Sequence, residues 1–116
     1  MIVPDVNLLV YAYDADSRFH AVAKAWWQGC LSGGETVGLP GVVAFGFVRL
    51  VTSARVFTHP MTPAEAAGHV REWLARPGVE WLEPQADHRF AALGTHPRRH
   101  GVPVKVVATP VDAEWS

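Results

Sequence analysis

The 116-residue chain is 49% hydrophobic and 18% charged, a length and composition that predict one folded domain and exclude a two-domain enzyme or a disordered chain. Ten Lys and Arg residues against eleven Asp and Glu residues give a net charge of −1, so the overall charge does not indicate a nucleic-acid binder and any such contact has to be local. The single cysteine, Cys30, excludes an intramolecular disulfide framework and a cysteine-based zinc site, and it favours a reducing compartment.

The sequence also lacks the marks of membrane insertion or export. No segment approaches the roughly 20 consecutive apolar residues that span a bilayer. The N-terminus lacks the basic start and the long apolar stretch of a signal peptide, because Asp5 follows after four residues. We therefore expect a cytoplasmic protein that does not enter a membrane.

A short strand and an apolar helix are expected first along the chain. Residues 2–3 indicate the strand, and Asn7 fits the N-cap of a helix over residues 8–13. Asp5 then lies in the turn that leaves the carboxyl end of a buried strand, which is where open α/β sheets bind ligands. Residues 8–13 are apolar nearly all round, so the reverse interpretation, a strand over the same residues, stays open.

An amphipathic helix, a strand and a second helix are expected next. Apolar residues recur at spacings of three and four over residues 19–30 and predict the first of these helices. Residues 36–40 indicate a strand. Residues 41 to about 56 indicate a helix whose exposed face carries Arg49 and Arg55.

The clearest local signal in the sequence is the segment 62–65, Thr-Pro-Ala-Glu. Thr at the cap, Pro at the first helical position and Glu at the third complete a capping box, so a helix is expected to begin here and to stop at residues 76–78. A third strand follows at residues 79–82, then a short helix over residues 87–93 and a fourth strand over residues 102–108. Strands that alternate with helices imply a parallel α/β sheet.

Three acidic residues follow predicted strands. Asp5 follows the first strand, Asp87 opens a helix after the third, and Asp112 follows the fourth. Because the carboxyl ends of parallel strands lie along one edge, these carboxylates could converge there. A hard divalent cation such as Mg²⁺ or Mn²⁺ relieves the repulsion between them. Such a site can bind a phosphodiester, activate water and stabilise the leaving oxygen.

Several stretches of the first 84 residues match one known pattern. They are residues 1–17, 25–27, 37–40, 46–52, 55–57 and 74–79. Together they resemble the PIN-domain ribonuclease toxins of the VapC type. The resemblance implies an α/β fold, PIN-like and three-layered (α/β/α), with a short parallel sheet flanked by helices. It covers about residues 1–84 of a single domain that comprises residues 1–116. Residues 85–116 diverge from the family, so we expect the fold to be incomplete at the C-terminus.

The resemblance also implies a metal-dependent RNA cleavage site, built from three or four acids at the carboxyl edge of the sheet. The first family acid corresponds to Asp5. The second is commonly a Glu just before a Phe-x-Arg segment, and Gly46 stands there and supplies no ligand. The third corresponds to Asp87, and the final turn of the family corresponds to the segment with Asp112 and Glu114.

The alignment of the C-terminal acids has two solutions. The correspondence just given requires a deletion immediately after Pro84. In the competing alignment, residues 85–100 fill the helix that precedes the third acid, and the chain then diverges from the family.

The leading interpretation is an endoribonuclease toxin that depends on Mg²⁺, or on Mn²⁺, and hydrolyses phosphodiester bonds of RNA. Asp5, Asp87 and Asp112 are its expected catalytic residues and, together with Glu114, its metal ligands. The resemblance implies a cognate VapB-type antitoxin as partner, and we also expect a homodimer. The expected substrate is single-stranded or looped RNA, tRNA included, whose phosphates Arg49 and Arg55 contact.

Two alternatives stay open. A truncated relative could keep the antitoxin-binding surface and lack hydrolysis, which Gly46 and the divergent residues 85–116 favour. Residues 8–17 could instead form a strand that ends in Asp14-x-Asp16, as in phosphoryl-transfer enzymes of the haloacid dehalogenase type, where one Asp is the nucleophile and the next the general acid.

Overall fold

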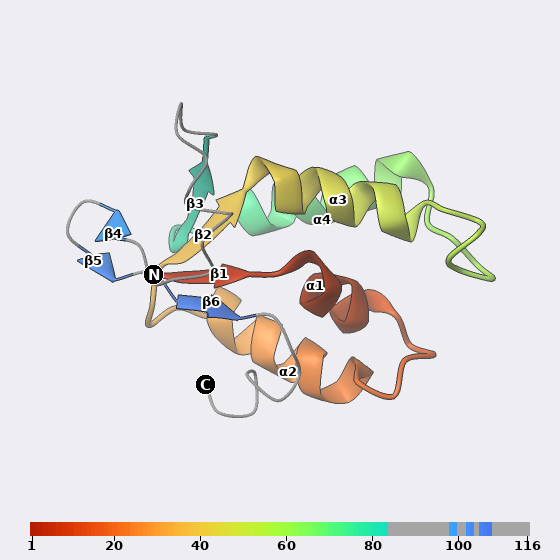
Figure 1. Ribbon diagram of the computed structural model, residues 1–116, viewed down its shortest axis with the longest axis horizontal. Coiled ribbons are helices and arrows are strands. Elements are labelled where there is room, and N and C mark those ends of the chain that lie inside the picture. Colours follow the sequence, from red (N-terminus) through yellow and green to blue (C-terminus); the bar gives the residue numbers. More distant parts are fainter. Residues whose placement is uncertain (84–97, 100–101, 104, 108–116) are drawn as a thin grey trace.

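Four parallel strands form the central sheet of the computed structural model (Figure 1), which describes residues 1–83, 98–99, 102–103 and 105–107. The strands lie in the order β3-β2-β1-β6, and each pairing is parallel. Their bounds are β1 (Ile2–Pro4), β2 (Val37–Pro40), β3 (Val79–Leu82) and β6 (Lys105–Val107). The predicted parallel sheet flanked by helices is confirmed, while the single-domain boundary stays a prediction.

The run expected as one strand over residues 102–108 is divided between two sheets, so that prediction was wrong. β5 (Val102–Pro103) pairs antiparallel with β4 (Arg98–Arg99), and β6 joins the parallel sheet beside β1. The physical reason for the break lies in Pro103, which has no N–H to donate along a ladder and therefore favours an edge position.

In the part of the chain that the structure describes, four helices flank the sheet, with α2 on one side of it and α3 and α4 on the other (Figure 1). They are α1 (Val6–Tyr13), α2 (His20–Leu31), α3 (Gly41–Val51) and α4 (Pro63–Leu74). α3 ends about five residues earlier than expected, because the Thr52 hydroxyl donates to the carbonyl of Val48 at 2.7 Å and the chain turns there. No helix of the described residues has the length and hydropathy to cross a membrane.

α1 settles the ambiguity at residues 8–13 in favour of a helix. It packs against both α2 and α3, so that Leu8, Leu9 and other positions around its circumference are buried. This explains a sequence that is apolar nearly all round. Asp14 is the C-cap of this helix, so the strand ending in Asp-x-Asp that a dehalogenase-type enzyme requires is absent from this segment.

α4 begins as the sequence predicts. The Glu65 N–H donates to Thr62 Oγ1 at 3.1 Å, and the Thr62 N–H donates to Glu65 Oε1 at 3.1 Å. Both bonds of the capping box are therefore present, with Pro63 at the first helical position. The hydrogen bonds from Thr62 lower the pKa of the Glu65 carboxyl.

Aromatic rings fill the space between the helices. Trp73 of α4 lies edge-on to Phe47 of α3 at 4.8 Å between ring centroids and to Trp27 of α2 at 5.3 Å. All three side chains are at most 2% exposed. A smaller cluster of Met1, Val3 and Leu82 is separate from this core. The aromatic core therefore holds α2, α3 and α4 together near the C-terminal end of α1.

Candidate active site

Asp5 stands where β1 ends and α1 begins. Its backbone is extended, and its N–H donates a 2.8 Å hydrogen bond to the carbonyl oxygen of Val107 in β6. Its own carbonyl accepts a longer bond of 3.4 Å from the Leu9 N–H. Asp5 is thus the N-cap of α1 through its backbone, and the expectation that Asn7 caps this helix was wrong. Pro4, which fixes its own φ near the extended region, holds the chain straight up to Asp5.

The carboxylate of Asp5 is not used by the helix that it begins. Its side chain makes no capping hydrogen bond and no ion pair with any residue that the structure describes. The residue is half-buried. The dipole of α1 favours negative charge at this end of the helix. A carboxyl group therefore stands at the carboxyl edge of the sheet with no described residue bound to its oxygens.

The strand order places Asp5 at the reversal point of the sheet (Figure 1). From β1 the chain adds β2 and then β3 on one side, and β6 lies on the other side of β1. In open parallel sheets, ligands bind outside the carboxyl ends of the strands at the point where the order reverses. Here that point lies between β1 and β6, whose carboxyl ends are joined by the hydrogen bond from the Asp5 N–H to the Val107 carbonyl oxygen.

α3 brings Gly46 against the start of α1. A Cβ added to Gly46 would lie 3.3 Å from Cγ2 of Val6, the residue after Asp5. Position 46 therefore lies against the residue that follows Asp5. The glycine supplies no oxygen, and a side chain at this position would require Val6 to shift by a few tenths of an ångström.

The other expected ligands, Asp87, Asp112 and Glu114, lie outside the described residues. Among residues 1–83 and the described strands that follow, no group of three or more His, Cys, Asp or Glu side chains could hold a metal ion. Of the predicted ligands, the structure therefore places Asp5 alone.

The two arginines expected at phosphates lie on or after α3. Arg49 is exposed in the last turn of the helix, and Arg55 is exposed in the turn that follows. In the part of the chain that the structure describes, neither guanidinium forms an ion pair. Both are thus available to an anion, and their contact with RNA stays a prediction.

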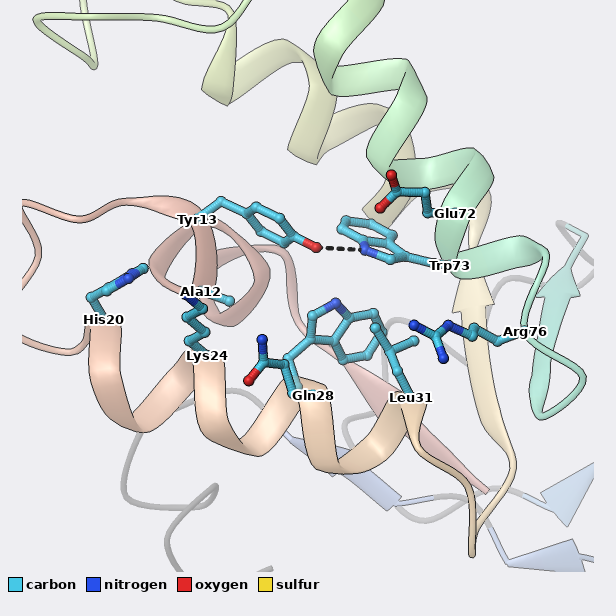
Figure 2. Close-up of a pocket in the computed structure, with 10 residues that line it drawn as sticks. Ala12, Tyr13, His20, Lys24, Gln28, Leu31, Glu72, Trp73 and Arg76 are labelled. Carbon is cyan, nitrogen blue, oxygen red and sulfur yellow. Dashed lines mark hydrogen bonds between the residues drawn. The ribbon is translucent and has the colours of Figure 1, made fainter.

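A cavity of about 380 Å³ lies between α1, α2 and α4, away from Asp5 (Figure 2). Tyr13 and Trp73 meet at its wall, where the indole Nε1–H donates to the Tyr13 hydroxyl at 2.9 Å. Burial raises the pKa of the Tyr13 phenol. Tyr13 ends the eight-residue helix that Asp5 begins, so about 12 Å of helix separates this cavity from the carboxylate. The cavity was not predicted from sequence patterns, because Tyr13 and Trp73, which meet at its wall, are 60 positions apart.

No protein-family model matches the chain, whereas individual relatives do. Ribonuclease VapC33 of Mycobacterium tuberculosis is 45% identical over 94 residues, which are 81% of this chain and 66% of the relative. Ribonuclease VapC43 of the same organism is 42% identical over 91 residues, covering 78% and 62%. Ribonuclease VapC37, also of M. tuberculosis, is 35% identical over 88 residues, covering 76% and 61%.

A solved structure has the same fold. The crystal structure of M. tuberculosis VapC20, described as a sarcin-ricin loop cleaving toxin, superposes with a TM-score of 0.57 at 22% identity, covering 97% of this chain and 76% of that one. The chain spans somewhat less than two thirds of the length of the curated relatives it matches.

Proposed function

The chain belongs to the VapC family of PIN-domain proteins, and we propose that it is an endoribonuclease toxin that hydrolyses phosphodiester bonds of RNA. The observation that carries this proposal is Asp5, a carboxylate without a partner in the described structure, at the reversal point of a parallel sheet. The names of VapC33, VapC43 and VapC37, each called a ribonuclease, support the activity.

The proposed cofactor is Mg²⁺, with Mn²⁺ as the alternative ion. The fit rests on the chemistry of Asp5, because carboxylate oxygens are the ligands that these hard cations prefer. The positive end of the α1 dipole opposes a cation beside Asp5, so further carboxylates are needed. We assign that role to Asp87, Asp112 and Glu114. A bound ion would supply an activated water and stabilise the charge that develops on the leaving oxygen.

The residues of this chain then have separate tasks in the proposed reaction. Asp5 would hold the ion, and the hydrogen bond from its backbone N–H to Val107 fixes the backbone that carries the carboxylate. Gly46 lets α3 pack closely against Val6, the residue after Asp5. Arg49 and Arg55 contact phosphates of the bound RNA. The family resemblance supports a VapB-type antitoxin as the inhibitor, a homodimer, a cytoplasmic location and RNA, tRNA included, as substrate.

The proposal is tested by exchanging the charge of Asp5 with little change of shape. Asp5→Asn should lower RNA cleavage by more than about 100-fold, since changes to residues that only orient metal ligands already cost about 10- to 100-fold. Growth inhibition in a host that lacks the antitoxin should disappear with it. The thermal unfolding midpoint should change little, because the backbone bond to Val107 is kept.

Asp16→Asn is the matched control, since Asp16 is an exposed acid in the turn after α1. It should cut RNA and inhibit growth like the wild type. Full activity of Asp5→Asn would refute the proposed mechanism.

A second candidate function is antitoxin binding without hydrolysis, which Gly46 favours because it removes one oxygen ligand beside Asp5. Isothermal titration with Mn²⁺ separates the two. Binding that Asp5→Asn abolishes supports the nuclease, whereas a wild-type protein that binds antitoxin, does not bind Mn²⁺ and does not cut RNA supports the second function.

A further inference from the structure

The solvent-facing side of α3 is apolar in a way that the fold does not require. Its exposed positions are Val42, Phe45 and Arg49, spaced three and four residues apart on one stripe. The Val42 side chain is 73% exposed and that of Phe45 is 69% exposed. The outer face of a surface helix is usually polar, because apolar side chains there gain nothing from burial. This stripe therefore presents two large apolar groups to a ligand or to solvent.

An aromatic residue of the sheet stands behind the stripe. The rings of Phe45 and Trp81 of β3 meet edge to face, with centroids 6.0 Å apart and an interplanar angle of 75°. Gly41, the first residue of α3, allows this, since a Cβ there would lie 3.0 Å from Cζ2 of Trp81. The half-buried Trp81 thus contacts the Phe45 ring from the side of the sheet, and much of Phe45 remains uncovered.

The stripe lies beside the edge of the sheet that carries Asp5. α3 begins directly at the carboxyl end of β2, and Trp81 is near the carboxyl end of β3. Two strand spacings of about 4.8 Å separate β3 from β1, or about 10 Å. About three stacked nucleotides at 3.4 Å each span that length. A strand of RNA whose scissile phosphate lies at Asp5 therefore reaches β3, whose Trp81 contacts Phe45, within a few nucleotides.

The charge of α3 favours a polyanion as the occupant. The helix contains no acidic residue, and its single charged side chain, Arg49, lies one turn beyond Phe45 on the same stripe. An exposed aromatic ring beside a cation is the combination that binds single-stranded nucleic acid, because each base has a face to stack and each nucleotide a phosphate to neutralise. A second copy of the chain fits less well, since a stable protein interface needs about 800 Å² from each partner and this stripe offers two apolar side chains.

We infer that Val42, Phe45 and Arg49 form an RNA subsite in which one unpaired base stacks on Phe45, supported by Trp81, while Arg49 contacts the adjacent phosphate. This rests on the proposed ribonuclease function and adds to it a side chain that binds a base a few nucleotides away from the cleavage site.

Binding is measured on the Asp5→Asn protein, so that the probe is not cut. The probe is a fluorescein-labelled, unstructured oligoribonucleotide of mixed sequence, about 12 nucleotides long. Adding Phe45→Ala should raise the Kd by about 5- to 100-fold, the range expected for loss of one stacked base. Phe45→Trp should bind like the parent, and Phe45→Leu, which keeps apolar area and loses the ring, should bind like Phe45→Ala. The control is Val56→Ala, a change at another exposed apolar residue (52% exposed), which should leave the Kd unchanged.

A scan of the same probe with single abasic nucleotides supplies a second readout. In the parent protein, removal of the base at one position of the probe should lower the affinity. In Phe45→Ala, removal of the same base should lower the affinity no further. An unchanged Kd for Phe45→Ala, or parent-like binding by Phe45→Leu, would overturn the stacking subsite. So would sedimentation data in which Phe45→Ala converts a dimer into a monomer, because the stripe would then be a protein interface. If the wild type cuts RNA and Phe45→Ala is unaffected, this inference alone fails; if the wild type neither binds nor cuts RNA, the ribonuclease function fails with it.

Discussion

The hydrogen bond between Trp73 and Tyr13 joins α4 to the C-terminal end of α1. Its contribution to stability should be measurable as a coupling energy between the two residues. Trp73 is 1% exposed, and its Nε1–H donates to the Tyr13 hydroxyl at 2.9 Å. Its ring also contacts Phe47 and Trp27. Trp73→Ala removes both the packing and the bond and should cost about 3–5 kcal/mol of the free energy of unfolding. That is a large part of the 5–15 kcal/mol typical of a whole domain.

Smaller changes separate the bond from the packing. Trp73→Phe keeps an aromatic ring in the core and leaves the Tyr13 hydroxyl without its donor. Tyr13→Phe removes the acceptor. A buried hydrogen bond contributes about 1 kcal/mol net, and an unmatched buried group costs about 1–3 kcal/mol. The two single variants together should therefore lose more free energy than the double variant loses.

Urea unfolding of the wild type, both single variants and the double variant measures this difference. We expect a coupling energy of about 1 kcal/mol, within the 0.5–3 kcal/mol found for residues in contact. Activity should be little changed in Tyr13→Phe, since about 12 Å of helix separates Tyr13 from Asp5. A coupling below about 0.3 kcal/mol, the usual error of additivity, would refute the assigned role of the bond.

Two further predictions concern single groups. Burial, with a smaller contribution from Glu35, raises the pKa of the Cys30 thiol from 9.0 to about 11. Folding thus favours the protonated thiol, a contribution to stability that is complete below pH 9 and is lost as the pH rises through about 11. Alkylation of Cys30 by iodoacetamide at pH 8 should be about 100-fold slower in the folded than in the unfolded protein, and a folded-state rate that levels off near pH 9 would contradict this. Thr62→Ala should lower the free energy of unfolding by about 1 kcal/mol in urea titration, because α4 loses its side-chain cap. Glu65→Gln should cost less, since an amide oxygen can still accept from the Thr62 N–H, and equal losses would argue against the cap as the cause.

Local signals explain what the sequence predicted correctly. The start of α4 depends on four consecutive residues, so it could be predicted without the rest of the fold. The position of Asp5 at the carboxyl end of a strand was equally local. α1 remained ambiguous because a helix packed on both sides and a buried strand share the same apolar run.

Features that depend on strand order or on distant partners could not be predicted in the same way. The bond from Asp5 to Val107 exists because β6 lies beside β1 across more than 100 residues, and nothing in either segment specifies that pairing. The division of residues 102–108 has a local part and a distant part, since Pro103 interrupts the ladder, whereas the partner strand of each part depends on the whole fold. The meeting of Tyr13 and Trp73 needs both α1 and α4 in place. Asp87, Asp112 and Glu114 lie outside the described residues and stay predictions.

α3 connects the proposed catalytic edge with the proposed RNA subsite. Phe45 and Gly46 are consecutive, so they project about 100° apart around the helix. Gly46 lies against Val6 beside Asp5, and Phe45 lies against Trp81 on the outer side. Any shift of α3 that makes room for a side chain at position 46 must therefore also move Phe45 relative to β3. Glycine at position 46 avoids this conflict, because it lets α3 approach α1 closely while the Phe45 ring keeps its support from Trp81. The glycine at position 46 and the fixed position of the Phe45 ring thus depend on the same close contact between α3 and α1.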